Sequence, residues 1–112
     1  MKAATPELDQ AAVDGAATRL LAATPEGSEV VLFGSYARGD ATAGSDLDFL
    51  VIEPEARDPH GERVRLRAVL RDSPVGVDVL VVSRERFEAW RHKPSTIDHA
   101  ADREGRRYRR GA

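Results

Sequence analysis

Residues 34–48 read Gly-Ser-Tyr-Ala-Arg-Gly-Asp-Ala-Thr-Ala-Gly-Ser-Asp-Leu-Asp, and this stretch decides the fold. It lies between two β-branched, mainly apolar runs, Glu29–Phe33 and Leu47–Ile52, each of which is typical of a strand. A flexible Gly-Ser pair after the first run can bind a phosphate through backbone and hydroxyl groups. Paired carboxylates at the start of the second run can hold metal ions beside that phosphate.

The rest of the chain alternates helical and strand patterns around this stretch. Thr5-Pro6-Glu7 predicts a helix start, and Pro25 and Gly27 predict its end. The other expected elements are a short helix at 35–38, a helix at 60–71, a strand at 75–82, a short helix capped by Ser83, and a last helix with Ser95 and Asp98 as a capping box, ending at Gly105. Strands that alternate with helices predict an α/β fold, a sheet packed with helices.

Composition limits the class of protein. The chain has 112 residues, enough for a single domain over 1–112, with a core at about 29–82 and C-terminal helices and tail at 83–112. The net charge of −2 argues against a dedicated nucleic-acid-binding protein. The chain has no cysteine that could form a disulfide or a zinc–thiolate site. Without a signal-peptide core or a membrane-length apolar stretch, we expect a cytoplasmic protein with no membrane partner.

Three aspartates carry the chemistry that we expect. Residues i and i+2 of a strand share a face, so Asp46 and Asp48 should project together, with Cα atoms roughly 6.5–7 Å apart. Asp78 interrupts the apolar run 77–82 and is costly to bury without a partner. If the strands that hold these residues are neighbours, three carboxylates meet and repel one another. Such a cluster makes sense with bound cations, and oxygen ligands suit Mg²⁺.

Each feature alone has a simpler interpretation. Asp46 can cap a turn, Asp78 can be a charge on an edge strand, and a Gly-Ser pair is common in loops. The spacing matches neither a Walker A motif, since no Gly-Lys-Ser/Thr follows, nor an EF-hand. The agreement of spacing, strand context and a third acid is what favours a catalytic site.

The same residues resemble the DNA polymerase beta-like nucleotidyltransferase superfamily. The likeness rests on Gly34-Ser35, ten further residues, the pair Asp46 and Asp48, and Asp78 on a later strand, and it extends over about Val30–Val82. The local phrases are most similar to the minimal nucleotidyltransferases, whose Arg-Glu-Gly…Tyr ending resembles Arg103–Tyr108. The resemblance implies a polymerase beta-like fold with a small mixed sheet packed with helices.

The resemblance also implies roles for the matching residues. Gly34 and Ser35 would bind the β- and γ-phosphates of ATP, Asp46 and Asp48 would bind two Mg²⁺ ions, and Asp78 would bind the metal that activates the incoming hydroxyl. Arg38 is either a phosphate contact or an ordinary surface arginine.

Minimal nucleotidyltransferases often occur beside a helical HEPN protein, as antitoxin and toxin. The resemblance therefore implies transfer of AMP to a tyrosine hydroxyl of a HEPN toxin, with that toxin as partner. The absence of an additional domain for antibiotic or RNA favours a substrate supplied by a separate protein. Two alternatives stay open: nucleotidylation of a small hydroxylated molecule of the aminoglycoside type, and a non-catalytic antitoxin that neutralises its partner by binding.

Two further patterns have modest interpretations. Arg63, Arg67 and Arg71 recur every fourth residue, and we interpret this stripe as a solvated helix face. Phe87 and Trp90 are expected on the buried side of the helix that Ser83 caps.

Overall fold

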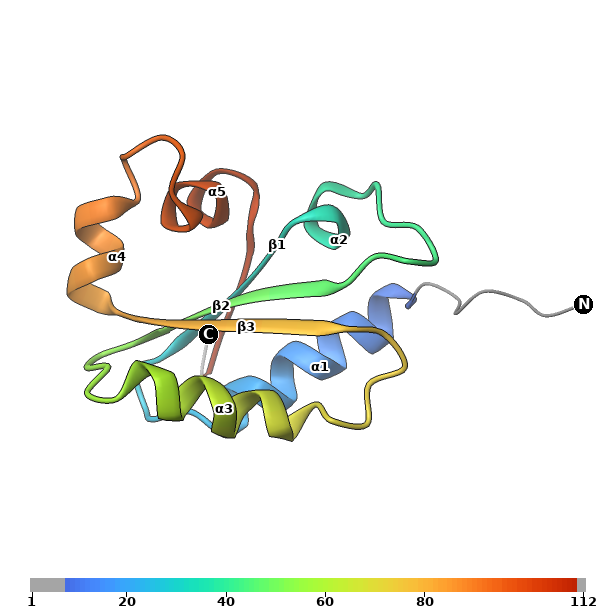
Figure 1. The fold of residues 1–112 in the computed structure, drawn as a ribbon, viewed down its shortest axis with the longest axis horizontal. Helices are drawn as coiled ribbons and strands as arrows, with labels where there is room; N and C mark the ends of the chain where they lie inside the picture. Colours follow the sequence, from blue (N-terminus) through green and yellow to red (C-terminus); the bar gives the residue numbers. More distant parts are fainter. Residues whose placement is uncertain (1–7, 111–112) are drawn as a thin grey trace, which may run out of the picture.

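The computed structural model describes residues 8–110, and their elements alternate as the sequence predicts (Figure 1). The helices are α1 (Gln10–Ala22), α2 (Ser35–Arg38), α3 (Pro59–Val69), α4 (Arg84–Trp90) and α5 (Ile97–Glu104). The strands are β1 (Glu29–Phe33), β2 (Leu47–Glu53), β3 (Val77–Ser83) and β4 (Arg106–Arg109). The predicted α/β fold, with helices packed on a small mixed sheet, is confirmed.

The four strands form one sheet in the order β3-β2-β1-β4. β1 runs antiparallel to both β2 and β4, whereas β2 and β3 are parallel. The parallel pair is connected through α3, as parallel neighbours require a crossover. This register places the end of β1 beside the starts of β2 and β3.

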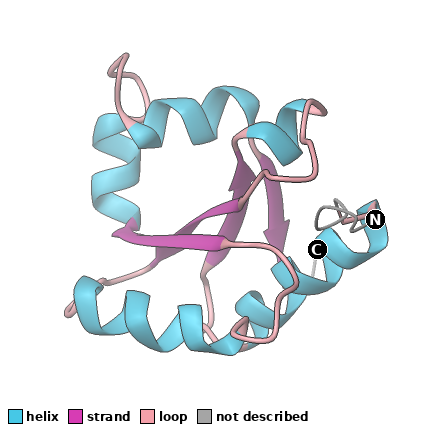
Figure 2. Cartoon of the chain, turned by 45° about the vertical axis from the view of Figure 1, so that its right-hand side comes forward, coloured by secondary structure: helices cyan, strands magenta, loops and turns pink. Residues whose placement is uncertain are grey.

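Each face of the sheet is covered by its own helices (Figure 2). On one face, Phe49 and Val51 pack with residues of α1 and α3, such as Leu20 and Leu66. On the other, Leu50 packs with Phe87 of α4 and Ala101 of α5. The strand period of two explains this division, because successive side chains of β2 point to opposite faces.

The first helix begins later than the sequence predicts. Leu8 and Asp9 are not helical, and the Asp9 carboxylate accepts a hydrogen bond from the Ala12 amide, which caps a helix starting at Gln10. Thr5–Glu7, the predicted start, lies outside the described residues. The helix ends at Ala22, ahead of Pro25 as expected.

The last helix is shifted by one residue from its predicted cap. Thr96, not Ser95, is the N-cap, and its hydroxyl accepts a hydrogen bond from the His99 amide. Ser95 has φ 74°, so it lies in the left-handed turn that precedes the cap. Gly105 follows the helix as predicted.

The tail after Gly105 forms a strand that the sequence did not predict. Arg106–Arg109 pairs antiparallel with β1 and makes the edge strand β4. Its Tyr108 hydroxyl donates to Asp14 of α1 at 2.6 Å, and its arginines contact acids of neighbouring elements. The run of arginines concealed the strand, since these residues have low β-propensity in isolation and are held here by ion pairs.

Within the described range, no helix is both long and apolar enough to cross a membrane.

Candidate active site

Two of the three predicted aspartates are direct neighbours across the parallel strands. Asp48 of β2 and Asp78 of β3 occupy the same register position, on strands that pack about 4.8 Å apart. Phe33, the last residue of β1, is the partner of Asp48 on the other side. The sheet therefore brings the Gly34–Ser35 turn and two carboxylates together at one end of the strands, on the face that α4 and α5 cover.

Gly34 is required at the turn for two reasons. Its φ of 79° lies in the region that residues with a side chain rarely adopt. A Cβ at this position would also overlap the Asp48 carboxylate, which lies directly against the Gly34 backbone. The sequence pattern Gly-Ser thus gives Asp48 the space to approach the loop.

Asp46 lies one residue before β2 and is turned toward β3. The Leu47 amide donates to the Gly76 carbonyl at 2.8 Å, which brings the two strand starts together. A Cβ at Gly76 would overlap the Asp46 carboxylate, so Asp46 lies over this glycine while Asp48 lies against Gly34. The two carboxylates are near one another but approach different backbones.

The charges at this edge are coupled. Burial raises the pKa of Asp48, and the negative charges of Asp78 and Asp46 raise it further, while Arg38 acts in the opposite direction. Asp78 forms an ion pair with Arg63 at 3.3 Å, and both side chains are about half exposed. The positive charge of Arg63 offsets part of the repulsion between Asp78 and the other two aspartates. A cation bound between these carboxylates would relieve the rest.

The donor set fits Mg²⁺, although the carboxylates do not converge on one point. All three are oxygen donors within electrostatic reach of each other. In residues 8–110, however, no group of three or more His, Cys, Asp or Glu side chains is arranged so that it could hold a metal ion. The orientations of Asp46 over Gly76 and of Asp78 toward Arg63 account for this.

A carboxylate of α5 that the sequence did not predict contacts the Gly34–Ser35 turn. The Gly34 amide donates to Glu104 Oε2 at 2.8 Å, and Arg38 Nη1 contacts the same oxygen at 3.2 Å. Arg38 also pairs with Asp40 at 3.3 Å, so it faces the loop and is held there by two acids. The available signal was the Arg-Glu-Gly ending, since Glu104 is its central residue.

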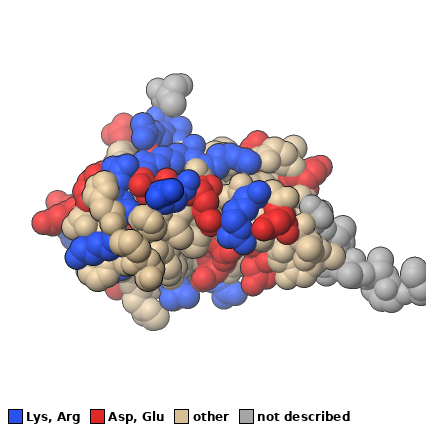
Figure 3. Space-filling view, turned by 90° about the horizontal axis from the view of Figure 1, so that it is seen from above, with Lys and Arg blue, Asp and Glu red and all other residues tan. Residues whose placement is uncertain are grey.

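The basic stripe on α3 is more than the solvated face that the sequence indicated. Arg63 pairs with Asp78, and Arg67 donates to the Val77 carbonyl at 3.0 Å, so both hold the start of β3. Trp90 also differs from its prediction: it is 39% exposed, whereas Phe87 is fully buried. Figure 3 looks down on the α4 and α5 side, where acidic and basic side chains are interspersed.

Comparison with known proteins identifies the family to which the chain belongs. A search among curated proteins finds no match to the chain. The family model for the nucleotidyltransferase domain matches residues 15–103, which includes the Gly34–Ser35 turn and all three aspartates. Members of this family generally use Mg²⁺ and nucleoside triphosphates. The chain belongs to the nucleotidyltransferase domain family, within the polymerase beta-like superfamily.

Proposed function

We propose that this nucleotidyltransferase is a minimal nucleotidyltransferase that transfers AMP from ATP to a tyrosine hydroxyl of a partner HEPN toxin, and so acts as its antitoxin. The observation that carries the transfer reaction is the register pairing of Asp48 with Asp78 beside the Gly34 turn. The choice of a HEPN partner rests on the resemblance of residues 34–51 and 103–108 to minimal nucleotidyltransferases.

Each residue of the site has a role in this reaction. The Gly34 amide, the Ser35 hydroxyl and Arg38 would bind the β- and γ-phosphates, and Asp46, Asp48 and Asp78 would hold two Mg²⁺ ions. Bound Mg²⁺ supplies charge neutralisation for the phosphates and lowers the pKa of a coordinated hydroxyl. Asp78 orients the acceptor hydroxyl, whose oxygen forms a bond to the α-phosphorus as the bond to pyrophosphate breaks. The hydroxyl proton leaves to solvent through this carboxylate.

The exposure of the site suits an acceptor carried by another protein. The Asp78 side chain is 48% exposed, and Asp46 is exposed as well. A tyrosine on the surface of a partner can reach such a carboxylate, whereas a small sugar would need walls on several sides to be held.

The test is transfer from α-labelled ATP with Mg²⁺, in the presence and absence of the protein encoded next to this chain, followed by intact-mass analysis. A gain of AMP on the neighbour, lost in the Asp46→Asn, Asp48→Asn double variant, supports the proposal. The Glu55→Gln variant, whose exposed carboxylate lies outside the site, is the matched control and should transfer normally.

The other outcomes separate the alternatives. A tight complex without transfer would contradict AMP transfer and indicate neutralisation by binding. Neither transfer nor complex, together with modification of an aminoglycoside, would indicate a small hydroxylated substrate. Transfer to the neighbour at a residue other than tyrosine would contradict the acceptor that we propose.

A further inference from the structure

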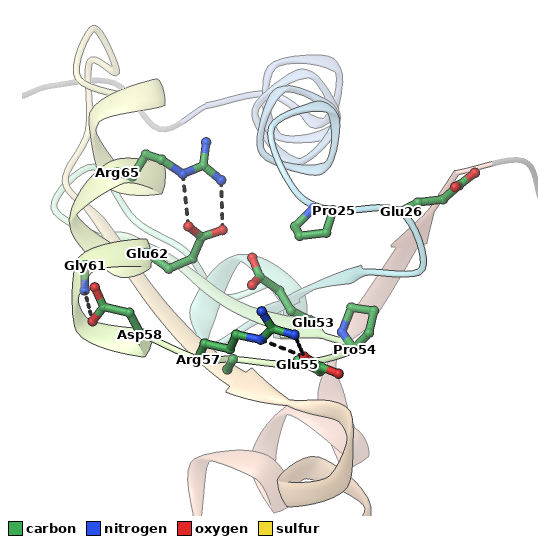
Figure 4. Close-up of a pocket in the computed structure, with 11 residues that line it drawn as sticks. Pro25, Glu26, Glu53, Pro54, Glu55, Arg57, Asp58, Gly61, Glu62 and Arg65 are labelled. Atoms are coloured by element: carbon green, nitrogen blue, oxygen red, sulfur yellow. Dashed lines mark hydrogen bonds and ion pairs between the residues drawn. The ribbon is translucent and has the colours of Figure 1, made fainter.

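A pocket of about 760 Å³ lies at the end of β2 that is remote from Asp48 (Figure 4). The end of β2, the 54–58 loop and the first turns of α3 form its walls, and Pro25 and Glu26 close one side. It shares no residue with the nucleotidyltransferase site described above. The proposed transfer reaction therefore does not account for the residues of this pocket.

Glu53 is the unusual residue of this pocket. It is the last residue of β2, only 4% exposed, and its Oε2 atom has no hydrogen-bond partner within the part of the chain that the structure describes. Figure 4 shows its carboxyl group directed into the space between Pro25 and Glu62. A buried carboxyl oxygen without a donor is costly, so this atom is available for a ligand.

The two arginines of the pocket already pair with glutamates, and its other charged residues are acids. Arg57 pairs with Glu55 at 2.7 Å, and Arg65 donates to Glu62 at 2.8 Å and to the Ala23 carbonyl at 2.6 Å. The lining holds five acids against these two arginines: Glu26, Glu53, Glu55, Asp58 and Glu62. The excess of negative charge favours a cationic ligand.

Apolar groups complete the lining. Pro25 and Pro54 face the pocket from two separate loops (Figure 4), and Ala56 also lines it. Their carbon surfaces can cover a short hydrocarbon chain, as is usual in small-molecule sites that have few polar anchors. The pocket thus combines one buried acceptor, excess acid and an apolar wall.

The proton on Glu53 agrees with this interpretation. Burial, contact with Glu62 and the negative charge of Glu62 raise the pKa of Glu53 to about 8, against the opposing charge of Arg65. Near neutral pH, Glu53 therefore keeps a proton. A cation can replace that proton.

We propose that this pocket binds an organic cation, an ammonium or guanidinium group on a short hydrocarbon chain, with the Glu53 carboxylate as its main partner. Binding forms the Glu53–cation pair and releases the Glu53 proton to solvent, so charge and protons balance. The cation can be a free amine or the side chain of a lysine or arginine in another protein, because both present the same group.

The experiment is calorimetric titration of the full chain with agmatine as the free source and with acetyl-arginine methylamide as the side-chain source. Titrations at pH 7 in buffers of different ionisation enthalpy measure proton release, for which we expect about one proton per bound cation. Glu62 and Arg65 of α3 are the charged groups that act on the pKa of Glu53, and Glu26, Glu55, Arg57 and Asp58 are the other charged groups that line the pocket.

Substitutions make the result specific. Glu53→Gln keeps the shape but not the charge, so binding should weaken by about 10- to 100-fold and proton release should vanish. Glu55→Gln, on the rim, should change affinity less than about threefold. If the glutamine variant folds poorly, Glu53→Asp serves as the second variant. It retains an acid, so proton release should persist in it. Tighter binding of agmatine identifies a free amine, and tighter binding of the arginine derivative identifies a protein side chain.

Two results would overturn the proposal. One is the absence of binding by either probe to the wild-type chain. The other is equal affinity for the wild type and for the folded Glu53→Gln variant, since a cation held elsewhere would not respond to this residue. AMP transfer by Glu53→Gln should be unchanged, because the pocket and the aspartates lie at opposite ends of β2.

Discussion

β2 carries a carboxylate near each end, and the two differ in what surrounds them. Asp48 lies near the start of β2, where the charges of Asp46, Asp78 and Arg38 act on it. Glu53 is almost completely buried, with Glu62 as its acidic neighbour. Burial is the leading cause that raises the pKa of both groups. Two acids on one strand thus respond alike to burial, but only Asp48 lies beside the Gly34–Ser35 turn.

A third acid, Glu29 of β1, shows that burial alone does not set protonation. It is 1% exposed and pairs in register with Ile52, the residue before Glu53. Burial opposes its ionisation, yet hydrogen bonds from Arg84 and Arg109 and the charge of Arg107 lower its pKa. Arginines offset the effect of burial at Glu29 and keep it charged, whereas burial, reinforced by Glu62, raises the pKa of Glu53 and keeps it protonated.

The largest effect is expected at the Asp48 end of β2. The Asp46→Asn, Asp48→Asn double variant should lose nucleotidyl transfer by about 10³-fold or more, since it removes two of the carboxylates that would hold the Mg²⁺ ions that neutralise the phosphates. The melting temperature should stay the same or rise, because the substitution relieves repulsion around Asp48. Transfer assays and thermal unfolding measure both. A drop in melting temperature together with activity would attribute the loss to misfolding.

The second effect concerns Glu29. Glu29→Gln leaves Arg84, Arg107 and Arg109 without their acid, and because these arginines are partly exposed we expect a loss of about 1–3 kcal/mol of unfolding free energy. Glu53→Gln, the matched substitution at a neutral buried acid, should cost much less. Denaturant unfolding at pH 7 compares the two. Equal losses would show that position in the sheet, and not the arginines, determines the cost.

The third effect is a difference in pH dependence. Glu53 has a folded pKa of about 8, above its ordinary 4.5, so the folded state binds more protons than the unfolded state between these values. Stability from this group is complete below pH of about 4.5 and falls, by up to about 1.4 kcal/mol per pH unit, as pH rises toward 8.

Glu53→Gln should remove this decline, so its stability relative to wild type should increase with pH across that window. Glu29 acts in the opposite direction: its pKa is lowered, so its stabilisation is present above the ordinary value and lost in acid. Urea titrations at several pH values test both slopes. Parallel curves for wild type and Glu53→Gln would show that Glu53 is ionised in the folded state.

The sequence predicts the elements near the site well, because local patterns determine them. Glu29–Phe33 and the short helix at 35–38 have the predicted bounds, since Gly34 ends the strand and permits the turn. The starts of β2 and α4 also agree, because an apolar run and a serine cap are local signals. The sequence places Asp78 beside Asp48 on the condition that their strands are neighbours, and the structure shows that they are.

What the sequence could not predict depends on contacts between distant residues. Arg106–Arg109 becomes a strand because β1 offers an open edge and acids that pair with its arginines. Arg63 is a helix-face residue in sequence, and only the packing of α3 on β3 brings it to Asp78. The raised pKa of Glu53 comes from its burial and from Glu62, nine positions later, and no periodicity specifies either.

The smallest effect should come from Glu104, through which α5 contacts the Gly34–Ser35 turn. Its carboxylate accepts from the Gly34 amide and contacts Arg38, the two groups that we expect a triphosphate to use. Glu104→Gln weakens both contacts by removing the charge, by about 1 kcal/mol in total, so the KM for the nucleotide should fall by about threefold to fivefold with kcat little changed.

The opposite result would assign Glu104 a different role. If the carboxylate holds the turn in shape and does not compete with phosphate, the glutamine variant should show a higher KM, and Glu104→Ala a still higher one. Arg38→Ala provides the comparison, because it removes a phosphate contact and a Glu104 partner together. A decrease in KM for Glu104→Gln alongside an increase for Arg38→Ala would show that the acid of α5 and the triphosphate share one donor set at the start of α2.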